Sequence, residues 1–356
     1  MTDVISQDVR LLFDEISDKL NQHVILSDKT DSDAITLWIA GTYLMDYWEL
    51  WPKLYIHSPE RECGKTTLLT VIEAFVKKAQ MAGSITPSAL YRIIEVSQPT
   101  LCIDEADRFL NQNEELNGII NAGHKRRTAY KILSEKNKEG NWQAVSLSLW
   151  AAQAIAGIGS QSDTLMSRSI KVALRRKALS ETVDRVHLNF FEQHGELRNK
   201  LEAWGSEYGE AISKFAVMPP TISSDRAVDN WRPLFQIAEW IGGAWMDRAE
   251  VAYKTIEETR RENYIPSVGV ELLIDISSII DHEIAPEIPC RKLKKALLRL
   301  PETEWLTCNK GRAITDKWLA NKLRGYEVRS RKRSSHNVYL MTDLQDAIRR
   351  YVPPHT

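Results

Sequence analysis

The feature that most constrains the fold is Gly64-Lys65-Thr66, which lies between an expected strand and an expected helix. Residues 53–57 have the apolar character of a short strand, and residues 67–76 have the apolar spacing of a helix. Strand, loop and helix in this order are the setting of a phosphate-binding loop, in which backbone N–H groups and the helix start hold phosphate oxygens. The sequence therefore predicts an α/β protein with a nucleotide site on a parallel sheet.

The residues of this loop have definite expected roles. Lys65 is expected to reach the β- and γ-phosphates of ATP, and the hydroxyl of Thr66 to complete the coordination of Mg²⁺. Pro59 stands where the usual pattern has glycine, and proline has a fixed φ and no N–H. A chance Gly-Lys-Thr in a surface loop is the alternative interpretation. The residues expected to line the nucleotide are Pro59, Glu60, Arg61, Glu62, Cys63, Gly64, Lys65, Thr66 and Thr67.

A second element is the acid pair Asp104-Glu105, which follows the apolar residues 99–103. Neighbouring parallel strands would place Asp104 beside the loop, where it can hold water bound to Mg²⁺, and Glu105 where it can polarise the attacking water. Two carboxylates at the end of a buried strand are costly unless a metal or donors satisfy them. Alone, the pair also suits a solvated strand end. About forty residues after Gly-Lys-Thr, it predicts an ATPase.

Composition indicates a globular protein with more than one domain. The chain has 356 residues, of which 43% are hydrophobic and 27% charged. Its four cysteines form no CxxC pair, which argues against a zinc site or a disulfide framework and favours a reducing, cytoplasmic compartment. The first residues lack the pattern of a signal peptide, and the most apolar run, residues 34–47, is short and contains Asp46. We therefore expect no membrane association.

The net charge of −1 hides a basic C-terminal segment. Residues 290–336 contain fourteen Lys or Arg and four acids, so this segment carries about +10 and the remainder about −11. Such a local excess is typical of a nucleic-acid-binding face. A solvated basic surface without a partner is the alternative interpretation.

The remaining pattern divides the chain into four parts. Residues 1–50 are expected to form two helices packed on the core, and residues 51–178 the nucleotide-binding core of alternating strands and helices. Within the core, Thr86-Pro87 predicts a helix start, residues 113–123 a helix, and residues 130–133 and 144–149 a hairpin. Residues 179–266 are expected to be a helical lid.

The last part, residues 267–356, has the pattern of a winged helix. We expect helices over residues 270–280, 291–300 and 315–323, followed by a hairpin over residues 328–340. In that fold the third helix, with Lys322, would lie in a DNA groove, and the hairpin residues Arg331, Lys332 and Arg333 would contact phosphates. Winged helices also serve as protein-contact modules, which is the alternative.

Several motifs together carry a resemblance to a known family. They are SPERECGKTTLL, ITPSALYRIIE, PTLCIDEADRFL, NGIINAGHKR, AIAGIG, DTLMSRSIKVALRRK and RAVDNWRPLFQIAEWIGGAW. The chain resembles the uncharacterised ATPase domain of phage, plasmid and cassette-chromosome replication proteins, whose core is similar to MCM-like AAA+ helicases. The resemblance covers residues 38–351 and implies a P-loop AAA+ core, a helical lid and a C-terminal winged helix.

The resemblance also implies roles for arginines. Lys65 and Thr66 match the phosphate loop, and Asp104 and Glu105 match the metal-binding and water-activating acids. Arg168 lies just before an expected strand, where AAA+ proteins place the finger that enters a neighbour's site. An arginine that neutralises the end of a helix is the alternative for Arg168.

Two further positions are expected to sense the nucleotide. Either Arg226 or Arg232, in the segment that leads into the lid, could sense the γ-phosphate. Gln153 is a sensor candidate at the expected end of the fourth strand, where the family has Pro-Lys.

An arginine that acts in trans implies a homo-oligomer, which we expect to be a six-subunit ring or open spiral. Hydrolysis would then move a hairpin over residues 131–146, whose Lys136 and Lys138 could grip a nucleic-acid backbone. A structural hairpin with two solvated lysines is the alternative.

Two functions follow from these expectations. The chain is either a DNA helicase or translocase of a mobile genetic element, or an ATP-dependent switch or assembly subunit of a phage-defence complex that regulates a partner effector. Nothing before residue 30 is expected to form a primase or an origin-binding domain, so a primase or a nuclease is the expected partner.

Overall fold

The structure is a computed structural model that describes residues 2–110, 113–159, 161–263, 266–281, 285–301 and 303–352. The chain divides into two compact units, Met1–Glu262 and Asn263–Thr356, and each is described by itself.

The first unit is built on a five-stranded sheet whose paired strands are all parallel, which confirms the predicted α/β class. The strand order is β2-β3-β6-β1-β7. Because the strands are parallel, their carboxyl ends share one edge of the sheet and their amino ends share the other. The strands are β1 (Lys53–Ser58), β2 (Ala79–Ala82), β3 (Thr100–Ile103), β6 (Gln153–Ile158) and β7 (Ser169–Ala173).

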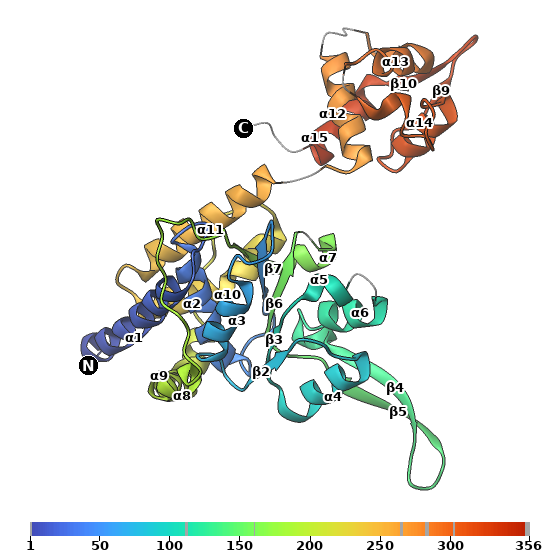
Figure 1. The fold of residues 1–356 in the computed structure, drawn as a ribbon. Helices are drawn as coiled ribbons and strands as arrows, with labels where there is room; N and C mark the ends of the chain where they lie inside the picture. The colour runs from blue at the N-terminus through green and yellow to red at the C-terminus, as the bar shows by residue number, and fades with distance from the viewer. Residues whose placement is uncertain are drawn as a thin grey trace. The chain divides into compact units, whose positions relative to one another are not determined.

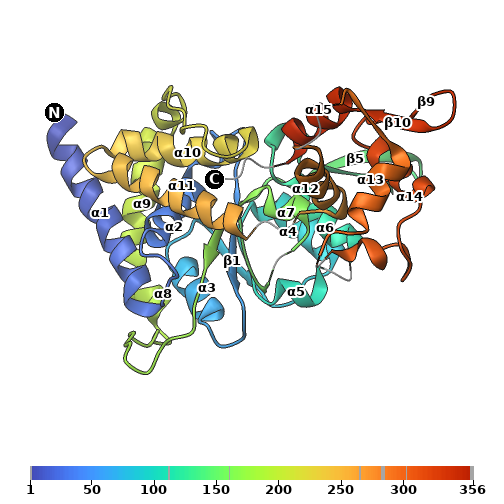
Figure 2. The same cartoon turned by 90° about the horizontal axis from the view of Figure 1, so that it is seen from above.

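Helices cover both faces of this sheet, as expected for parallel strands joined by helical crossovers. Figures 1 and 2 show α4 (Pro87–Ser97), α5 (Ala106–Phe109) and α6 (Glu114–Ala122) on one side. The other side carries α1 (Thr2–His23), α2 (Asp31–Gly41), α3 (Lys65–Glu73), α9 (Gly195–Ser213), α10 (Asp225–Ile241) and α11 (Trp245–Glu262). Two short helices are α7 (Asp163–Met166) and α8 (Phe190–Gln193).

Local capping explains where two of these helices begin. The Thr86 hydroxyl accepts a hydrogen bond from the Ala89 N–H at 3.3 Å, and Pro87 occupies the first helical position of α4. The Asn113 side chain accepts from the Leu116 N–H at 2.9 Å at the start of α6. Both predicted helix starts are therefore confirmed.

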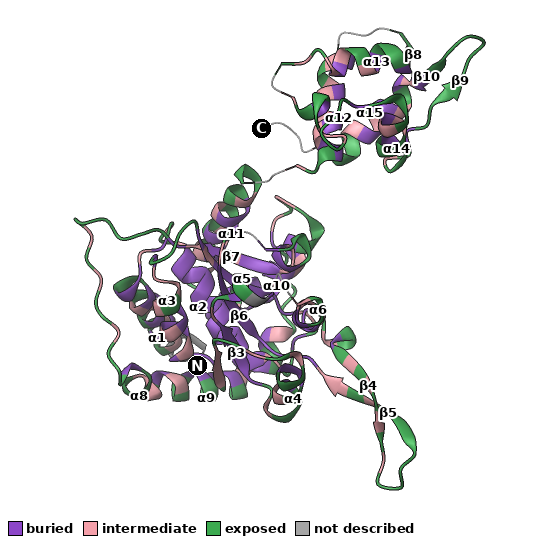
Figure 3. Cartoon of the chain, turned by 45° about the vertical axis from the view of Figure 1, so that its right-hand side comes forward, coloured by how far each residue is buried: buried purple, intermediate pink, exposed green. Residues whose placement is uncertain are grey.

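One continuous core holds the N-terminal helices, the sheet and the later helices together. Every residue of α2 is buried, because α1, α10 and α11 all pack on this helix. Trp38 of α2 and Trp231 of α10 are among the largest fully buried side chains. Figure 3 shows this buried interior between the sheet and the helices. Residues 1–50 are thus an integral part of the first unit.

The prediction that residues 180–265 are helical is wrong for residues 180–189 and 214–224, which form no helix. Part of the first stretch contacts the end of α1 instead. The Asp184 N–H donates to the Gln22 carbonyl at 2.9 Å, and the Asp184 carbonyl lies 3.0 Å from His23 Nδ1. These contacts give the Asp184 backbone partners without a helix.

A two-stranded hairpin projects from the first unit, as Figures 1 and 3 show. It consists of β4 (Tyr130–Lys136) and β5 (Trp142–Ser148), so the predicted hairpin is confirmed, with longer strands than expected. Leu133 and Leu147 pack against the core, while the side chains of Ile132 and Trp142 are 72% and 69% exposed.

The second unit contains the three predicted helices and the predicted hairpin, with one additional strand and one additional helix. Its sheet has the order β8-β10-β9 and is antiparallel. The elements are α12 (Val268–Ile280), β8 (Glu287–Pro289), α13 (Cys290–Leu297), α14 (Asp316–Arg324), β9 (Arg331–Lys332), β10 (Asn337–Leu340) and α15 (Met341–Tyr351). Across the described residues of both units, no helix has the length and apolarity needed to cross a membrane.

Candidate functional site

The loop that joins β1 to α3 presents unpaired backbone donors. The N–H groups of residues 60–67 donate no hydrogen bond to the described part of the chain. Gly64 has φ +89°, a conformation that residues with a Cβ atom rarely adopt, and Glu62 also has a positive φ of +62°. Successive N–H groups in such a loop form a concave site for an anion.

Lys65 begins α3 and folds back over this loop. Its Nζ donates to the Ser58 hydroxyl at 2.6 Å and to the Glu60 carbonyl at 3.2 Å. Pro59 follows the last residue of β1 and lies in the bend of the loop. The ammonium group therefore lies where an anion held by the loop would meet it.

The acid pair lies directly beside the start of α3. Asp104 follows β3, and its Oδ2 accepts a hydrogen bond from the Thr66 hydroxyl at 2.7 Å. Its Oδ1 accepts from the Glu105 N–H at 2.8 Å. Glu105 has φ +52°, and its Oε2 lies 2.5 Å from Nη1 of Arg108. The fold thus brings together the loop lysine, the threonine and both acids.

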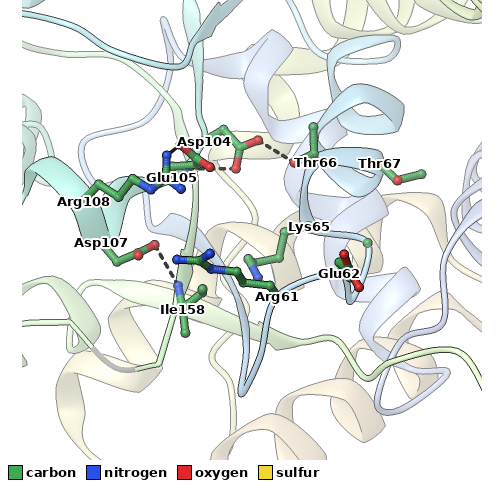
Figure 4. Close-up of a pocket in the computed structure, with 11 residues that line it drawn as sticks. Arg61, Glu62, Lys65, Thr66, Thr67, Asp104, Glu105, Asp107, Arg108 and Ile158 are labelled. Atoms are coloured by element: carbon green, nitrogen blue, oxygen red, sulfur yellow. Dashed lines mark hydrogen bonds and ion pairs between the residues drawn. The ribbon is translucent and has the colours of Figure 1, made fainter.

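These groups line a pocket of about 440 Å³ at the carboxyl edge of the sheet, shown in Figure 4. We call it the carboxyl-edge pocket. Asp107, Arg108 and Ile158 line it and were missed by the sequence reasoning; the Ile158 N–H donates to Asp107 Oδ1 at 3.0 Å. Spacing within the turn after Glu105 could have indicated Arg108. The full lining is Arg61, Glu62, Gly64, Lys65, Thr66, Thr67, Asp104, Glu105, Asp107, Arg108 and Ile158.

The donor set in this pocket fits Mg²⁺. The Thr66 hydroxyl and the Asp104 carboxylate are hard oxygen ligands in direct contact, and Mg²⁺ is commonly held by one or two such groups together with water and substrate phosphates. The described residues contain no cluster of three or more His, Cys, Asp or Glu side chains arranged for a metal.

The segment after β7 fixes the loop from outside. Nη2 of Arg176 donates to the Arg61 carbonyl at 2.9 Å and lies 4.0 Å from the Glu62 carboxylate.

His57, on β1, is neutral near pH 7 because burial, together with the charges of Lys171 and Lys65, lowers its pKa to about 4.

A second pocket, of about 280 Å³, lies at the amino edge of the sheet; we call it the amino-edge pocket. Arg168 precedes β7, and its Nη1 donates to the Asn121 carbonyl at 3.0 Å. Nη1 of Arg226 donates to the Ser167 hydroxyl at 2.8 Å. Burial and the Arg226 charge lower the pKa of Arg168. The lining is Asn121, Ala122, His124, Lys125, Thr128, Arg168, Arg226 and Asp229.

Buried polar groups next to Arg168 and His124 lack partners. Lys53 is 1% exposed, its Nζ has no hydrogen-bond partner in the described part of the chain, and burial and the Arg168 charge lower its pKa to about 7. Burial and then Lys53 lower the pKa of His124 to about 3, while His124 Nε2 lies 2.8 Å from Asn230 Oδ1. Burial thus shifts both groups toward the uncharged form.

The prediction that Gln153 ends the fourth strand is wrong. Gln153 begins β6, and Ile158 ends that strand at the carboxyl-edge pocket. Five steps along the strand, about 17 Å, separate the two positions. Apolar residues lie on both sides of Gln153 and give no sign of where the strand begins, so the sequence reasoning placed its end too early. Gln153 is fully buried, and its side-chain amide lacks a partner in the described chain.

The structure also separates the two sensor candidates of the lid segment. Arg226 lines the amino-edge pocket, whereas Arg232 pairs with Asp229 at 3.4 Å and lines neither pocket. Neither arginine lines the carboxyl-edge pocket of its own chain.

The lysines proposed to contact nucleic acid in the first unit lie at the end of the hairpin. Lys136 ends β4, with its Nζ 5.3 Å from the centre of the Trp142 ring. Lys138 lies in the exposed turn, which is closed by the Asn137 N–H donating to the Asn141 carbonyl at 2.9 Å.

In the second unit, two of the four residues expected to contact nucleic acid form ion pairs. Arg333 lies 2.5 Å from Glu287, and Arg331 lies 3.5 Å from Asp343. Lys332 is exposed in β9, and Lys322 of α14 lies with its Nζ 5.7 Å from the Trp318 ring centre.

Comparisons with known proteins give distant likenesses. An uncharacterized 28.9 kDa protein in the xis 5' region of Saccharopolyspora erythraea is 30% identical over 196 residues, which cover 51% of this chain and 70% of that protein. The apo A form of the NrS-1 C-terminal region has 13% identity and a TM-score of 0.39, covering 91% of this chain and 74% of that one. SCCmec type IV Cch, titled an active helicase, has 9% identity and a TM-score of 0.41, covering 88% and 68%.

A family match adds to these likenesses. The matched residues, 173–351, run from the end of β7 through the second unit and lie after the phosphate loop and the acid pair. They make up half of the chain, and the chain therefore belongs to the family described as "Protein of unknown function (DUF3631)".

Proposed function

We propose that this chain is an ATPase that acts on DNA as an oligomeric helicase or translocase of a mobile genetic element. The observation that carries the proposal is the 2.7 Å hydrogen bond between Thr66 and Asp104, next to Lys65 and a loop of unpaired N–H groups. This arrangement at the carboxyl edge of a parallel sheet suits a nucleoside triphosphate. The resemblance to phage and plasmid replication proteins supports the mobile-element context.

The proposed chemistry assigns a separate task to each side chain. The loop N–H groups and Lys65 bind the β- and γ-phosphates, and Thr66 and Asp104 would hold Mg²⁺, which when bound offsets phosphate charge. Glu105 orients the attacking water and accepts its proton. The water oxygen bonds to the γ-phosphorus as the bond to the β–γ bridging oxygen breaks. ADP leaves with that oxygen, and phosphate is the second product.

The amino-edge pocket supports an oligomer. Arg168 and Arg226 lie at the opposite edge of the sheet from their own phosphate loop, about 17 Å away along β1. If they stabilise charge on a triphosphate, that triphosphate is bound to a second copy of the chain. We propose a homo-oligomer, a hexameric ring or spiral, in which residues 51–178 form the core and the helices of residues 179–266 the lid.

DNA is proposed to bind the exposed lysines of the hairpin and the basic second unit, acting as a winged helix. Lys136 and Lys138 are available at the end of β4 and in the turn. The ion pairs of Arg331 and Arg333 involve partly exposed side chains, and such pairs are weak enough to exchange for phosphate contacts. Lys322 and Lys332 would add contacts that are independent of base sequence.

The test is to measure ATP hydrolysis and strand displacement together. We expect wild-type protein to hydrolyse ATP faster with single-stranded DNA and to displace a paired strand, and Lys65→Ala to do neither. Lys138→Ala should keep basal hydrolysis and lose about half or more of the stimulation by DNA. Hydrolysis without DNA stimulation or unwinding would favour a switch that regulates a partner such as a nuclease. Absence of ATP binding by wild-type protein would end the proposal.

A further inference from the structure

The cations around the carboxyl-edge pocket are few and their positions differ. Among the described residues that line it, Arg61, Lys65 and Arg108 carry positive charge. Gln153, Arg226 and Arg232 do not line it. A lining cation that contacts the third phosphate of a nucleotide in its own subunit is therefore one of these three residues.

Arg108 lies on the acid side of the pocket. It belongs to α5, the short helix that follows the acid pair, and its Nη1 lies 2.5 Å from Glu105 Oε2. Glu105 is the neighbour of Asp104, which bonds Thr66. Figure 4 shows Arg108 on this side, whereas Arg61 reaches in from the phosphate loop. A γ-phosphate adjacent to Thr66 and Asp104 would thus lie within reach of Arg108.

The bond between Arg108 and Glu105 is suited to exchange. The two side chains are 59% and 50% exposed, and ion pairs in solvent contribute little to stability. Charge-assisted hydrogen bonds from a guanidinium to phosphate oxygens are strong and can be bidentate. A triphosphate in the pocket therefore competes well for the Arg108 guanidinium.

We propose that Arg108 is the γ-phosphate sensor of its own subunit, which distinguishes bound ATP from ADP. The inference rests on the proposed function and assigns a residue that the phosphate-loop pattern does not contain. On ATP binding, the guanidinium turns from Glu105 to the γ-phosphate. The Glu105 carboxylate loses its partner and becomes free to accept the proton of the attacking water. ADP has no γ-phosphate, so the Arg108–Glu105 pair persists when ADP is bound.

The experiment compares the affinities of a nonhydrolysable ATP analogue, AMP-PNP, and of ADP in the full chain, measured by calorimetry with Mg²⁺. We expect Arg108→Gln to weaken AMP-PNP binding about tenfold and to change ADP binding less than about twofold. Arg108→Lys, which keeps the charge, should lose less AMP-PNP affinity. Arg92→Gln is the matched control, because Arg92 is exposed on α4, lies outside the pocket and should change neither affinity.

Each outcome has a defined meaning. An unchanged ratio of the two affinities in Arg108→Gln overturns the inference, and so does an equal loss for both nucleotides, which would mark Arg108 as structural. If Arg108→Gln does not fold, the same ratio in Arg108→Lys decides. If wild-type protein binds neither nucleotide, the proposed function itself is wrong. If wild-type protein binds both and the ratio is unchanged in Arg108→Gln, only the Arg108 assignment is wrong.

Discussion

The two edges of one parallel sheet carry pockets of opposite character. The carboxyl-edge pocket has four acidic and three basic lining residues among those described, and its acids lie beside unpaired loop N–H groups. The amino-edge pocket has Lys125, Arg168 and Arg226 against Asp229, next to buried polar groups without partners. In the proposed function, the carboxyl edge binds a triphosphate with its metal and the amino edge supplies positive charge.

This difference has a geometric consequence for assembly. The two pockets of one chain face away from each other across the sheet, so they can cooperate on one ligand when the carboxyl edge of one copy meets the amino edge of the next. Such a head-to-tail contact is heterologous and closes into a ring if the rotation allows it.

The largest effect that tests this comparison is expected from disabling each edge separately. Lys65→Ala should abolish ATP binding, while Arg168→Ala should keep binding and reduce hydrolysis at least about a hundredfold. Mixing the two inactive variants should restore activity to about a quarter of the wild-type value, because some interfaces then pair an intact loop with an intact arginine. Turnover of the single and mixed proteins measures this.

The mixing experiment distinguishes a site shared between two copies of the chain from a site completed within one copy. No recovery on mixing, in proteins that still assemble, would mean that both edges serve the same chain, and the comparison would fail.

The next effect concerns stability at the amino edge. Lys53→Met should raise the free energy of unfolding by about 2 kcal/mol at pH 7, because it removes a buried amine without a partner. The Lys53 pKa is about 7 in the folded chain and near 10.5 when unfolded, so the unfolded chain binds more protons between these values. Wild-type stability should therefore rise with pH from about 7 toward 10, and the advantage of Lys53→Met should shrink.

Urea unfolding at pH 7, 8 and 9 would measure this advantage, with Lys138→Met as the exposed-lysine control. A constant difference between Lys53→Met and wild type over that range would contradict a buried, titrating Lys53.

The smallest effect distinguishes the two arginines of α10. Arg226→Ala should lower ATP turnover about tenfold, because Arg226 lies with Arg168 in the amino-edge pocket. Arg232→Ala should change it less than about twofold, since Arg232 pairs with Asp229 in a partly exposed salt bridge. Steady-state turnover at saturating ATP compares them. The reverse ranking would assign the sensing role to Arg232.

Features set by local sequence could be predicted. The strand–loop–helix arrangement around Gly64, the acid pair after β3, the helix starts at Thr86 and Asn113, and the hairpin all depend on residues close in sequence, and the structure contains each of them. The contact between Thr66 and Asp104 followed from the rule that carboxyl ends of parallel strands share an edge.

Features set by packing or register could not be predicted in the same way. The start of β6 at Gln153 is fixed by pairing with β3, and an apolar run gives no boundary of its own. Residues 180–189 include Asp184, whose backbone contacts Gln22 and His23 at the end of α1, which is distant in sequence. The three-residue spacing of Glu105 and Arg108 could have indicated their contact, but no pattern indicated the Glu105 φ of +52°.

The complete burial of α2 also governs when the chain can fold. Residues 31–41 are covered by α1 and also by helices formed from residues 225–262, about two hundred positions later. During synthesis the part of the α2 surface that α10 and α11 cover therefore stays exposed until nearly all of the first unit has been made. We expect nascent chains that stop short of α11 to be bound by chaperones or to aggregate. If the chain is divided into two fragments upstream of residue 262, we expect both fragments to be needed together for the first unit to fold.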